Sequence, residues 1–147
     1  NRRFGSQKIP PEVEAIQTAL AGKTFDLFVD FHEDTDGLGF YLYEIFRPDR
    51  GGRVIGQNIV EVLSQRWSAD PRKEIEGFEN RNGVLRPEMS PAPRFQEGGL
   101  PLPVYLYFLG AGHCITLETP TAFPFEERVK IHLQGLETIL TLTGIMI

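Results

Sequence analysis

Cysteine is almost missing from this sequence of 147 residues, in which Cys114 is the single example. One cysteine forms no internal disulfide, and it excludes a zinc cluster built from several cysteines. Long apolar runs are missing too, because none approaches the roughly 20 residues that a membrane-spanning helix needs. No secretory signal is visible. We therefore expect a cytoplasmic protein without a membrane partner.

Positive charge is also in short supply. The chain carries 15 Lys and Arg against 20 Asp and Glu, which gives a net charge of −5 and a pI of about 5.2. Binding to nucleic acid needs a basic surface that neutralises phosphates, and no basic stripe is present. We therefore predict no nucleic-acid partner. A hydrophobic content of 41% over this length is enough for one compact domain, residues 1–147, with a real core.

Helical and strand-like patterns alternate along the chain. Helices are predicted at residues 10–22, at 54–67 and from Pro124 onward, and strands at 25–32, 39–46, 102–109 and 113–119. This alternation predicts an α/β fold, a mixed β-sheet flanked by helices. Function in such sheets usually lies at the carboxyl ends of the strands.

Two further segments carry specific expectations. In the last helix an apolar stripe, expected to face the core, consists of Phe125, Val129, Leu133, Leu136 and Leu140. Residues 70–101 are rich in Pro, Gly and charge, and Asn82-Gly83 is a typical two-residue hairpin turn. Long excursions of this kind in compact domains are often functional.

His32 is the first candidate for chemistry, because it stands near the end of an apolar strand. Asp30 precedes it by two residues, which places both side chains on one face of the strand. Asp30 could then orient the imidazole of a metal-binding His32. The alternative is a histidine that is simply packed or exposed at the surface.

The acidic residues after His32 do not form a calcium loop of the EF-hand type. With Gly37 at the sixth position of that loop, His32 would be first and Tyr43 twelfth, where the loop needs an acid and a glutamate. Asp34 and Asp36 could equally well make a turn.

Glu118 is the second candidate, at the end of the strand in "HCITLETP". A glutamate there is costly to bury unless it is paired or functional. It is either the partner of an arginine or a catalytic base, because partial burial raises the pKa of a carboxyl toward the working range. We interpret His113 and Cys114 as structural. No Gly-x-Ser-x-Gly motif supports a serine nucleophile.

Three segments together resemble the carboxypeptidase A-type zinc peptidases and the related branch that includes succinylglutamate desuccinylase and aspartoacylase. "NRRF" at the start is similar to the Asn-Arg pair that receives a substrate carboxylate. "VDFHED" is similar to the segment with the last zinc ligand, and "ITLETP" to the strand that bears the general base. The resemblance implies a zinc-carboxypeptidase-like (phosphorylase/hydrolase-like) fold. It also implies that His32 binds zinc, that Glu118 is the catalytic base, and that Asn1 and Arg2 bind substrate.

The departures from the family pattern are equally specific. The family takes its other two zinc ligands from a His-x-x-Glu motif upstream of Asn-Arg, and no His-x-x-Glu occurs here. We therefore expect the C-terminal portion of a longer catalytic domain, with two ligands of its one zinc ion upstream of Asn1, and little activity in this piece alone. Residues 78–101 also lack the mobile tyrosine of the peptidases. The expected substrate is a peptide or an acylated amino acid.

Two other interpretations remain open. One is a non-catalytic module that keeps the fold and binds a carboxylate without metal. The other is an interaction domain in which His32 is packed and Asn1 and Arg2 are only a flexible start. A His-x-x-Glu upstream of Asn1 would favour the enzyme. The oligomeric state is not predicted.

Overall fold

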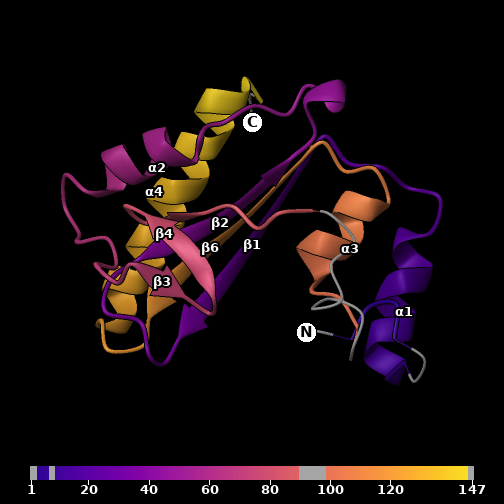
Figure 1. The fold of residues 1–147 in the computed structure, drawn as a ribbon, viewed down its shortest axis with the longest axis horizontal. Helices are drawn as coiled ribbons and strands as arrows, with labels where there is room; N and C mark the ends of the chain where they lie inside the picture. The colour runs from indigo at the N-terminus through magenta and orange to yellow at the C-terminus, as the bar shows by residue number, and fades with distance from the viewer. Residues whose placement is uncertain (1–2, 7–8, 90–98, 146–147) are drawn as a thin grey trace. The chain divides into compact units, whose positions relative to one another are not determined.

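The described part of the chain forms a six-stranded β-sheet in the order β1-β6-β2-β5-β4-β3, with four α-helices (Figure 1). The computed structural model describes residues 3–6, 9–89 and 99–145. The long strands are β1 (Leu27–Asp34), β2 (Tyr41–Phe46) and β6 (His113–Pro120). The short ones are β3 (Glu74–Ile75), β4 (Phe78–Arg81) and β5 (Val84–Leu85).

The neighbouring strands β1 and β6 run parallel. A hydrogen bond from Gly112 N to Phe25 O (2.8 Å) joins the residues just before the amino-terminal ends of the two strands. A second, from Thr121 N to Asp34 O (2.9 Å), joins their carboxyl-terminal ends. On its other side β6 has β2, which pairs in parallel with β5, while β4 pairs antiparallel with both β5 and β3. The mixed sheet and the α/β class are as the sequence predicts.

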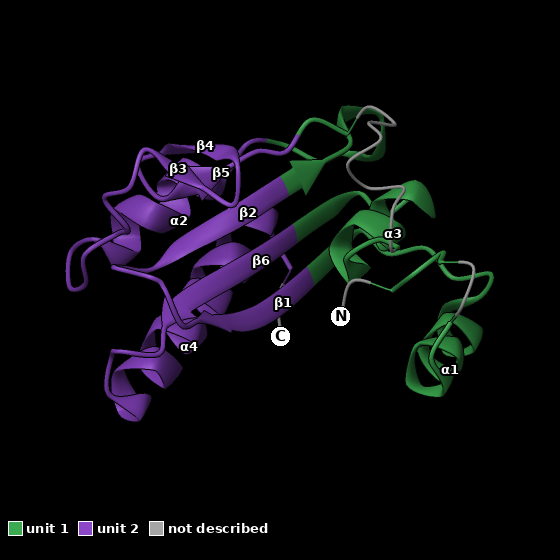
Figure 2. Ribbon diagram, turned by 60° about the horizontal axis from the view of Figure 1, so that its bottom comes forward, with its two compact units in different colours: residues 1–28, 45–53, 88–114 green, residues 29–44, 54–87, 115–147 purple. Residues whose placement is uncertain are grey.

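The chain divides into two compact units (Figure 2). Unit 1 comprises residues 1–28, 45–53 and 88–114, and unit 2 comprises residues 29–44, 54–87 and 115–147. The strands β1, β2 and β6 contribute residues to both. Unit 1 contains the helices α1 (Pro11–Leu20) and α3 (Leu102–Phe108) and the short 3-10 helix η1 (Pro48–Arg50). Unit 2 contains α2 (Gly56–Leu63) and α4 (Phe125–Thr143).

The predicted strand at residues 102–109 is wrong, because this segment is helix α3. Pro101 occupies the N-cap position without a capping hydrogen bond, and Pro103 lies in the first turn, where a missing N–H costs nothing and the fixed φ suits a helix. Val104 and Leu106 are buried in a cluster with Cys114. Tertiary packing thus overrides the β-propensity of the aromatic residues.

The hairpin predicted at Asn82-Gly83 is confirmed. It joins β4 to β5, and both turn residues have positive φ, 53° and 87°. This is the pattern of a type I′ turn, whose twist matches that of the flanking strands. A second turn with two positive φ angles, Glu76-Gly77, joins β3 to β4.

The core-facing side of α4 differs from the prediction. Ile131, Gly135 and Ile139 are buried, whereas most of the predicted stripe lies toward solvent. A Cβ atom on Gly135 would stand 2.5 Å from Leu117 Cδ2, so glycine lets the helix lie close to β6. A glycine carries no hydrophobic signal, and the pattern therefore favoured the wrong face. No helix in the described ranges is long and apolar enough to cross a membrane.

Candidate functional site

His32 and Glu118 lie side by side in unit 2, on the parallel neighbours β1 and β6. Each stands two residues before the end of its strand. The distance from His32 Nδ1 to Glu118 Oε1 is 3.6 Å. The structure therefore brings the two predicted residues together at one edge of the sheet, as expected for the carboxyl ends of parallel strands.

Asp30 holds the imidazole of His32 from the other side. His32 Nε2 lies 2.9 Å from Asp30 Oδ2, because residues two apart on a strand share a face. This hydrogen bond raises the pKa of His32, against the lowering effect of burial, and the negative charges of Asp30 and Glu118 raise it further. With Nε2 held by Asp30, it is Nδ1 that faces Glu118.

The Glu118 carboxyl has an unusual protonation equilibrium. Only 8% of the residue is exposed, and burial raises the pKa of Glu118 to about 7. The nearby His32 opposes this rise, while the negative charges of Asp34, Glu76 and Asp30 add to it. A carboxyl with a pKa near neutrality both accepts and releases protons under ordinary conditions, which is what general acid–base catalysis requires.

The site fits one ligand position of a catalytic zinc centre. A histidine that binds a metal commonly shares its other ring nitrogen with a carboxylate, and Asp30 stands in that relation to His32. A catalytic zinc ion needs three protein ligands. Within residues 3–6, 9–89 and 99–145, no group of three or more His, Cys, Asp or Glu side chains is arranged to hold a metal.

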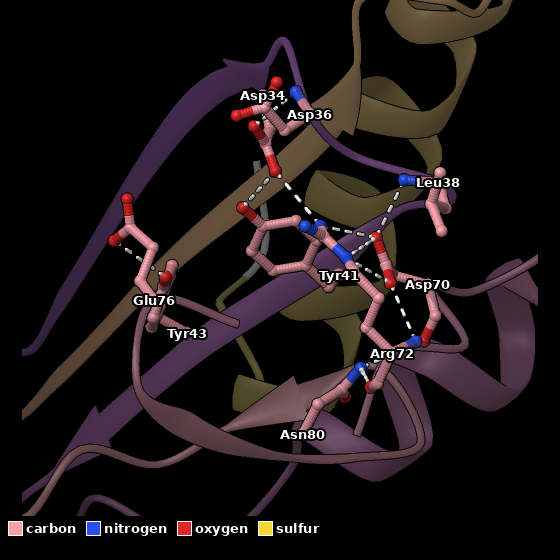
Figure 3. A network of polar contacts seen from close by, with 9 residues as sticks. All are labelled: Asp34, Asp36, Leu38, Tyr41, Tyr43, Asp70, Arg72, Glu76 and Asn80. Atoms are coloured by element: carbon pink, nitrogen blue, oxygen red, sulfur yellow. Dashed lines mark hydrogen bonds and ion pairs between the residues drawn. The ribbon is translucent and has the colours of Figure 1, made fainter. Parts of the chain in front are cut away.

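The acidic turn after His32 is attached to Arg72, a partner that sequence patterns do not reveal (Figure 3). Asp34 Oδ2 accepts hydrogen bonds from Arg72 Nη2 (3.2 Å) and the Tyr41 hydroxyl (3.0 Å), and Asp34 Oδ1 accepts one from the N–H of Asp36 (2.9 Å). Burial acts to raise the pKa of Asp34, but these hydrogen bonds lower it below its usual value. Asp34 and Asp36 thus form a turn that fixes the end of β1.

Asp70 is a second acidic partner of Arg72 in the same network. Its buried carboxylate accepts hydrogen bonds from Arg72 Nε and Nη2 and from the N–H of Leu38 (2.8 Å). Asn80 Nδ2 donates to the backbone oxygens of Asp70 and Arg72, which ties the β4 strand to the network. Since Asp34 and Arg72 are 38 residues apart, no local pattern could have paired them.

Two other acidic side chains have structural partners. Glu33, for which the sequence suggests no role, forms an ion pair with Arg128 of α4. Buried Glu44 accepts hydrogen bonds from the N–H groups of Ile55 and Gly56 at the start of α2 and from Arg86. A carboxylate there stabilises the helix, because the helix N-terminus is electropositive.

The remaining predicted residues divide into two groups. Asn1 and Arg2 lie outside the described residues, so their role as substrate ligands stays a prediction. Cys114 and His113 are buried in β6, with 1% and 3% exposed, in agreement with a structural role. Burial raises the pKa of the Cys114 thiol to about 12.

The fold is an α/β fold shared with metallopeptidase-like crystal structures. One is a "putative metallopeptidase" from Shewanella amazonensis SB2B (TM-score 0.75, 17% identity), which matches 97% of this chain and 54% of its own. Proteins of the same description from Shewanella denitrificans OS217 (0.73, 20%) and Shewanella baltica OS155 (0.74, 19%) match 99% and 97% of this chain, and 52% and 54% of their own. At these identities the likeness concerns the fold alone.

The chain spans about half the length of these structures. No protein-family model matches the sequence, and no curated protein matches it. The likeness supports a metallopeptidase-like fold, and it does not distinguish the carboxypeptidase A family from others with that fold.

Proposed function

We propose that this chain is the C-terminal portion of a zinc-dependent hydrolase that cleaves a peptide or amide bond in a substrate with a free carboxylate. One observation supports it most strongly. His32 and the buried Glu118 face each other 3.6 Å apart on parallel strands of a metallopeptidase-like fold. The pKa of Glu118, about 7, suits a residue that moves protons.

His32 would be one ligand of a single zinc ion, through Nδ1, with two further ligands upstream of Asn1. When bound, zinc lowers the pKa of a coordinated water toward neutrality and polarises a carbonyl. Asp30 keeps the His32 ring in the orientation that presents Nδ1.

Glu118 would remove a proton from the attacking water and pass it to the leaving amine. Arg2 would hold the substrate carboxylate in a two-pronged hydrogen bond, which the planar guanidinium favours, and Asn1 would add a neutral donor. The turn at Asp34, fixed by Arg72, keeps the end of β1 in place beside the reacting groups.

An N-acyl amino acid deacylase of the same fold is the second candidate. Residues 78–101 contain no tyrosine, whereas the peptidases that the sequence resembles carry a mobile one there. Such an enzyme would hydrolyse the amide of a small acylated amino acid with the same Glu118 and His32.

The test is Glu118→Gln in the whole gene product, that is, this chain together with any residues that precede Asn1. Glutamine keeps the shape of the side chain and cannot accept the proton. Hydrolysis of N-blocked dipeptides and N-acyl amino acids should fall at least about a hundredfold, the low end of general-base contributions. Glu61→Gln, at an exposed position of α2, is the matched control and should keep full activity. Undiminished turnover in Glu118→Gln would exclude the assigned role.

A further inference from the structure

The turn between β4 and β5 carries the one Asn-Gly pair of the sequence, Asn82-Gly83. Asn82 is exposed at the tip of the hairpin, whereas Gly83 is buried. Asparagine is a thermolabile residue, and it is most labile before glycine, because no side chain shields the glycine nitrogen from the neighbouring amide. The pair that best suits a type I′ turn is therefore also the most reactive one.

The reaction needs only these two residues and water. The Gly83 nitrogen loses its proton and attacks Cγ of Asn82. A bond forms between that nitrogen and Cγ, the bond from Cγ to Nδ2 breaks, and the side-chain amide leaves as ammonia. Water then opens the resulting succinimide ring at either of its two carbonyls, which leaves aspartate or isoaspartate in place of the asparagine.

The folded hairpin holds the attacking nitrogen away from this reaction. Gly83 N–H donates a hydrogen bond to Oδ1 of Asn80 (2.7 Å), and the Gly83 carbonyl accepts one from the N–H of Leu42 in β2 (2.9 Å). The backbone is also closely packed, because a Cβ atom on Gly83 would stand 3.0 Å from Cβ of Ala69. To react, the nitrogen must leave Asn80 and the peptide after Asn82 must rotate, so the hairpin must first open.

Asn80 is itself fixed on its other side. Its Nδ2 donates to the backbone oxygens of Asp70 (2.9 Å) and Arg72 (2.7 Å), beside which it lies in Figure 3. Its own N–H donates to the carbonyl of Lys73 (2.9 Å). The oxygen and the nitrogen of the Asn80 amide thus both have partners, and the side chain keeps its oxygen directed at the Gly83 N–H.

We propose that Asn82 is a deamidation site that is silent in the folded hairpin and reactive when the hairpin opens, with Asn80 as the residue that protects it. The co-reactant is water, and the products are aspartate and isoaspartate. The proposal concerns contacts within unit 2 and does not depend on the proposed hydrolase activity.

The modification would change the hairpin itself. Isoaspartate adds a carbon atom to the main chain, so a two-residue turn no longer matches the pairing of Arg81 with Val84. The same change would draw Asn80 away from the backbone of Arg72, whose side chain holds the acidic turn at the end of β1. Deamidation at the hairpin tip would therefore loosen the network beside the candidate site.

Peptide mapping by mass spectrometry tests the site in the whole gene product. The protein is incubated in mildly alkaline buffer, folded in one sample and unfolded by urea in the other. Asn82 should deamidate at least about tenfold more slowly in the folded sample. Asn58, which precedes Ile59, is the internal control and should stay intact in both. Equal rates in the two samples, or an unmodified Asn82 in urea, would overturn the proposal.

Asn80→Ala tests the protecting residue, because it removes the acceptor of the Gly83 N–H. Deamidation without urea should become at least about tenfold faster than in the wild type, since several hydrogen bonds that oppose opening are lost. Glu61→Ala, at an exposed position of α2, is the matched control and should leave the rate unchanged. A folded Asn80→Ala variant that deamidates at the wild-type rate would refute the role of Asn80.

A third measurement needs no variant, so it decides the question even where Asn80→Ala fails to fold. Hydrogen exchange of the Gly83 amide and deamidation of Asn82 both require the Gly83 N–H to leave Asn80. Across urea concentrations below the unfolding transition, the two rates should rise in proportion. Faster exchange at Gly83 without faster deamidation at Asn82 would contradict the proposed mechanism.

Discussion

Arg72→Met should destabilise unit 2 strongly, because it leaves the buried carboxylate of Asp70 without its counter-charge. The Asp70 side chain is 0% exposed, and the Arg72 guanidinium donates to both of its carboxylate oxygens, at 2.9 Å for Nε to Oδ1 and 2.7 Å for Nη2 to Oδ2. Two backbone N–H groups, those of Leu38 (2.8 Å) and residue 72 (3.0 Å), would remain as donors. The carboxylate would keep hydrogen bonds but lose its counter-charge.

The expected cost follows from these contacts. Removing one partner of a buried ion pair destabilises a protein by roughly 3–5 kcal/mol. We expect about 3 kcal/mol, the low end of that range, because the two backbone donors stay and Arg72 is itself 29% exposed. Asp70→Asn combined with Arg72→Met should cost less than the sum of the two single substitutions, since the double variant leaves no buried charge unpaired.

The pH dependence of the free energy of unfolding should also change in the Arg72→Met variant. Burial acts to raise the pKa of Asp70, but the hydrogen bonds from Arg72 and from Leu38 N–H lower it in the folded state. This stabilisation is therefore present above the unfolded value of about 3.9 and is lost as the pH falls through the lower folded value. In Arg72→Met burial should dominate and raise the pKa of Asp70, so that this group destabilises the fold increasingly as the pH rises above the unfolded value of about 3.9.

Urea unfolding between about pH 3 and pH 7 measures both effects. The fluorescence of Trp67 reports on unit 2, because it is the only tryptophan of the chain and is buried there, with 9% exposed. Lys130→Met, at an exposed position of α4, is the control for loss of a surface cation. Additivity of Asp70→Asn and Arg72→Met within about 0.5 kcal/mol, or identical pH profiles for wild type and Arg72→Met, would refute the reasoning.

Three shorter predictions concern packing, the thiol and the metal. Gly135→Ala should destabilise unit 2 by about 1–2 kcal/mol in the same urea assay, because its Cβ would meet Leu117 Cδ2 at 2.5 Å and the strain outweighs the gain in helix propensity; an increase in stability would contradict the close helix–sheet packing. Cys114 should not react with a thiol reagent at about pH 8 until the protein is unfolded, since burial raises its pKa to about 12; rapid native-state labelling would show that β6 opens readily. The 147-residue chain should lose zinc to a mild chelator, while the whole gene product should retain about one ion per chain, because a catalytic site needs three ligands; stoichiometric zinc retained by the 147 residues would disprove the incomplete site.

The candidate site was largely predictable because its parts are local features of strands. The end of an apolar run places His32 near the end of β1, and the spacing of two residues places Asp30 beside it at 2.9 Å. That Glu118 lies 3.6 Å from His32 required the strand order, which puts β6 directly beside β1. The pKa of Glu118 is likewise a property of the assembled site, because it depends on burial and on neighbouring charges.

Two elements show where local patterns fail. The segment 102–109 has the aromatic composition of a strand, yet Pro101 and Pro103 start a helix that packs Val104 and Leu106 into unit 1. In α4 three apolar residues of the predicted stripe, Phe125, Val129 and Leu133, are exposed, whereas the buried face consists of Ile131, Gly135 and Ile139. Hydrophobicity alone does not distinguish a helix face that packs inside the chain from one that lies toward solvent.

The sequence by itself determined the α/β alternation, the type I′ turn at Asn82-Gly83 and the common face of Asp30 and His32. These depend on backbone geometry within a few residues, where spacing and allowed φ angles leave few choices. Only the tertiary structure decided which face of α4 is buried and that Arg72 joins Asp34 to Asp70. Such partners meet through the packing of distant segments, and burial and charge pairing belong to that arrangement rather than to any local stretch of chain.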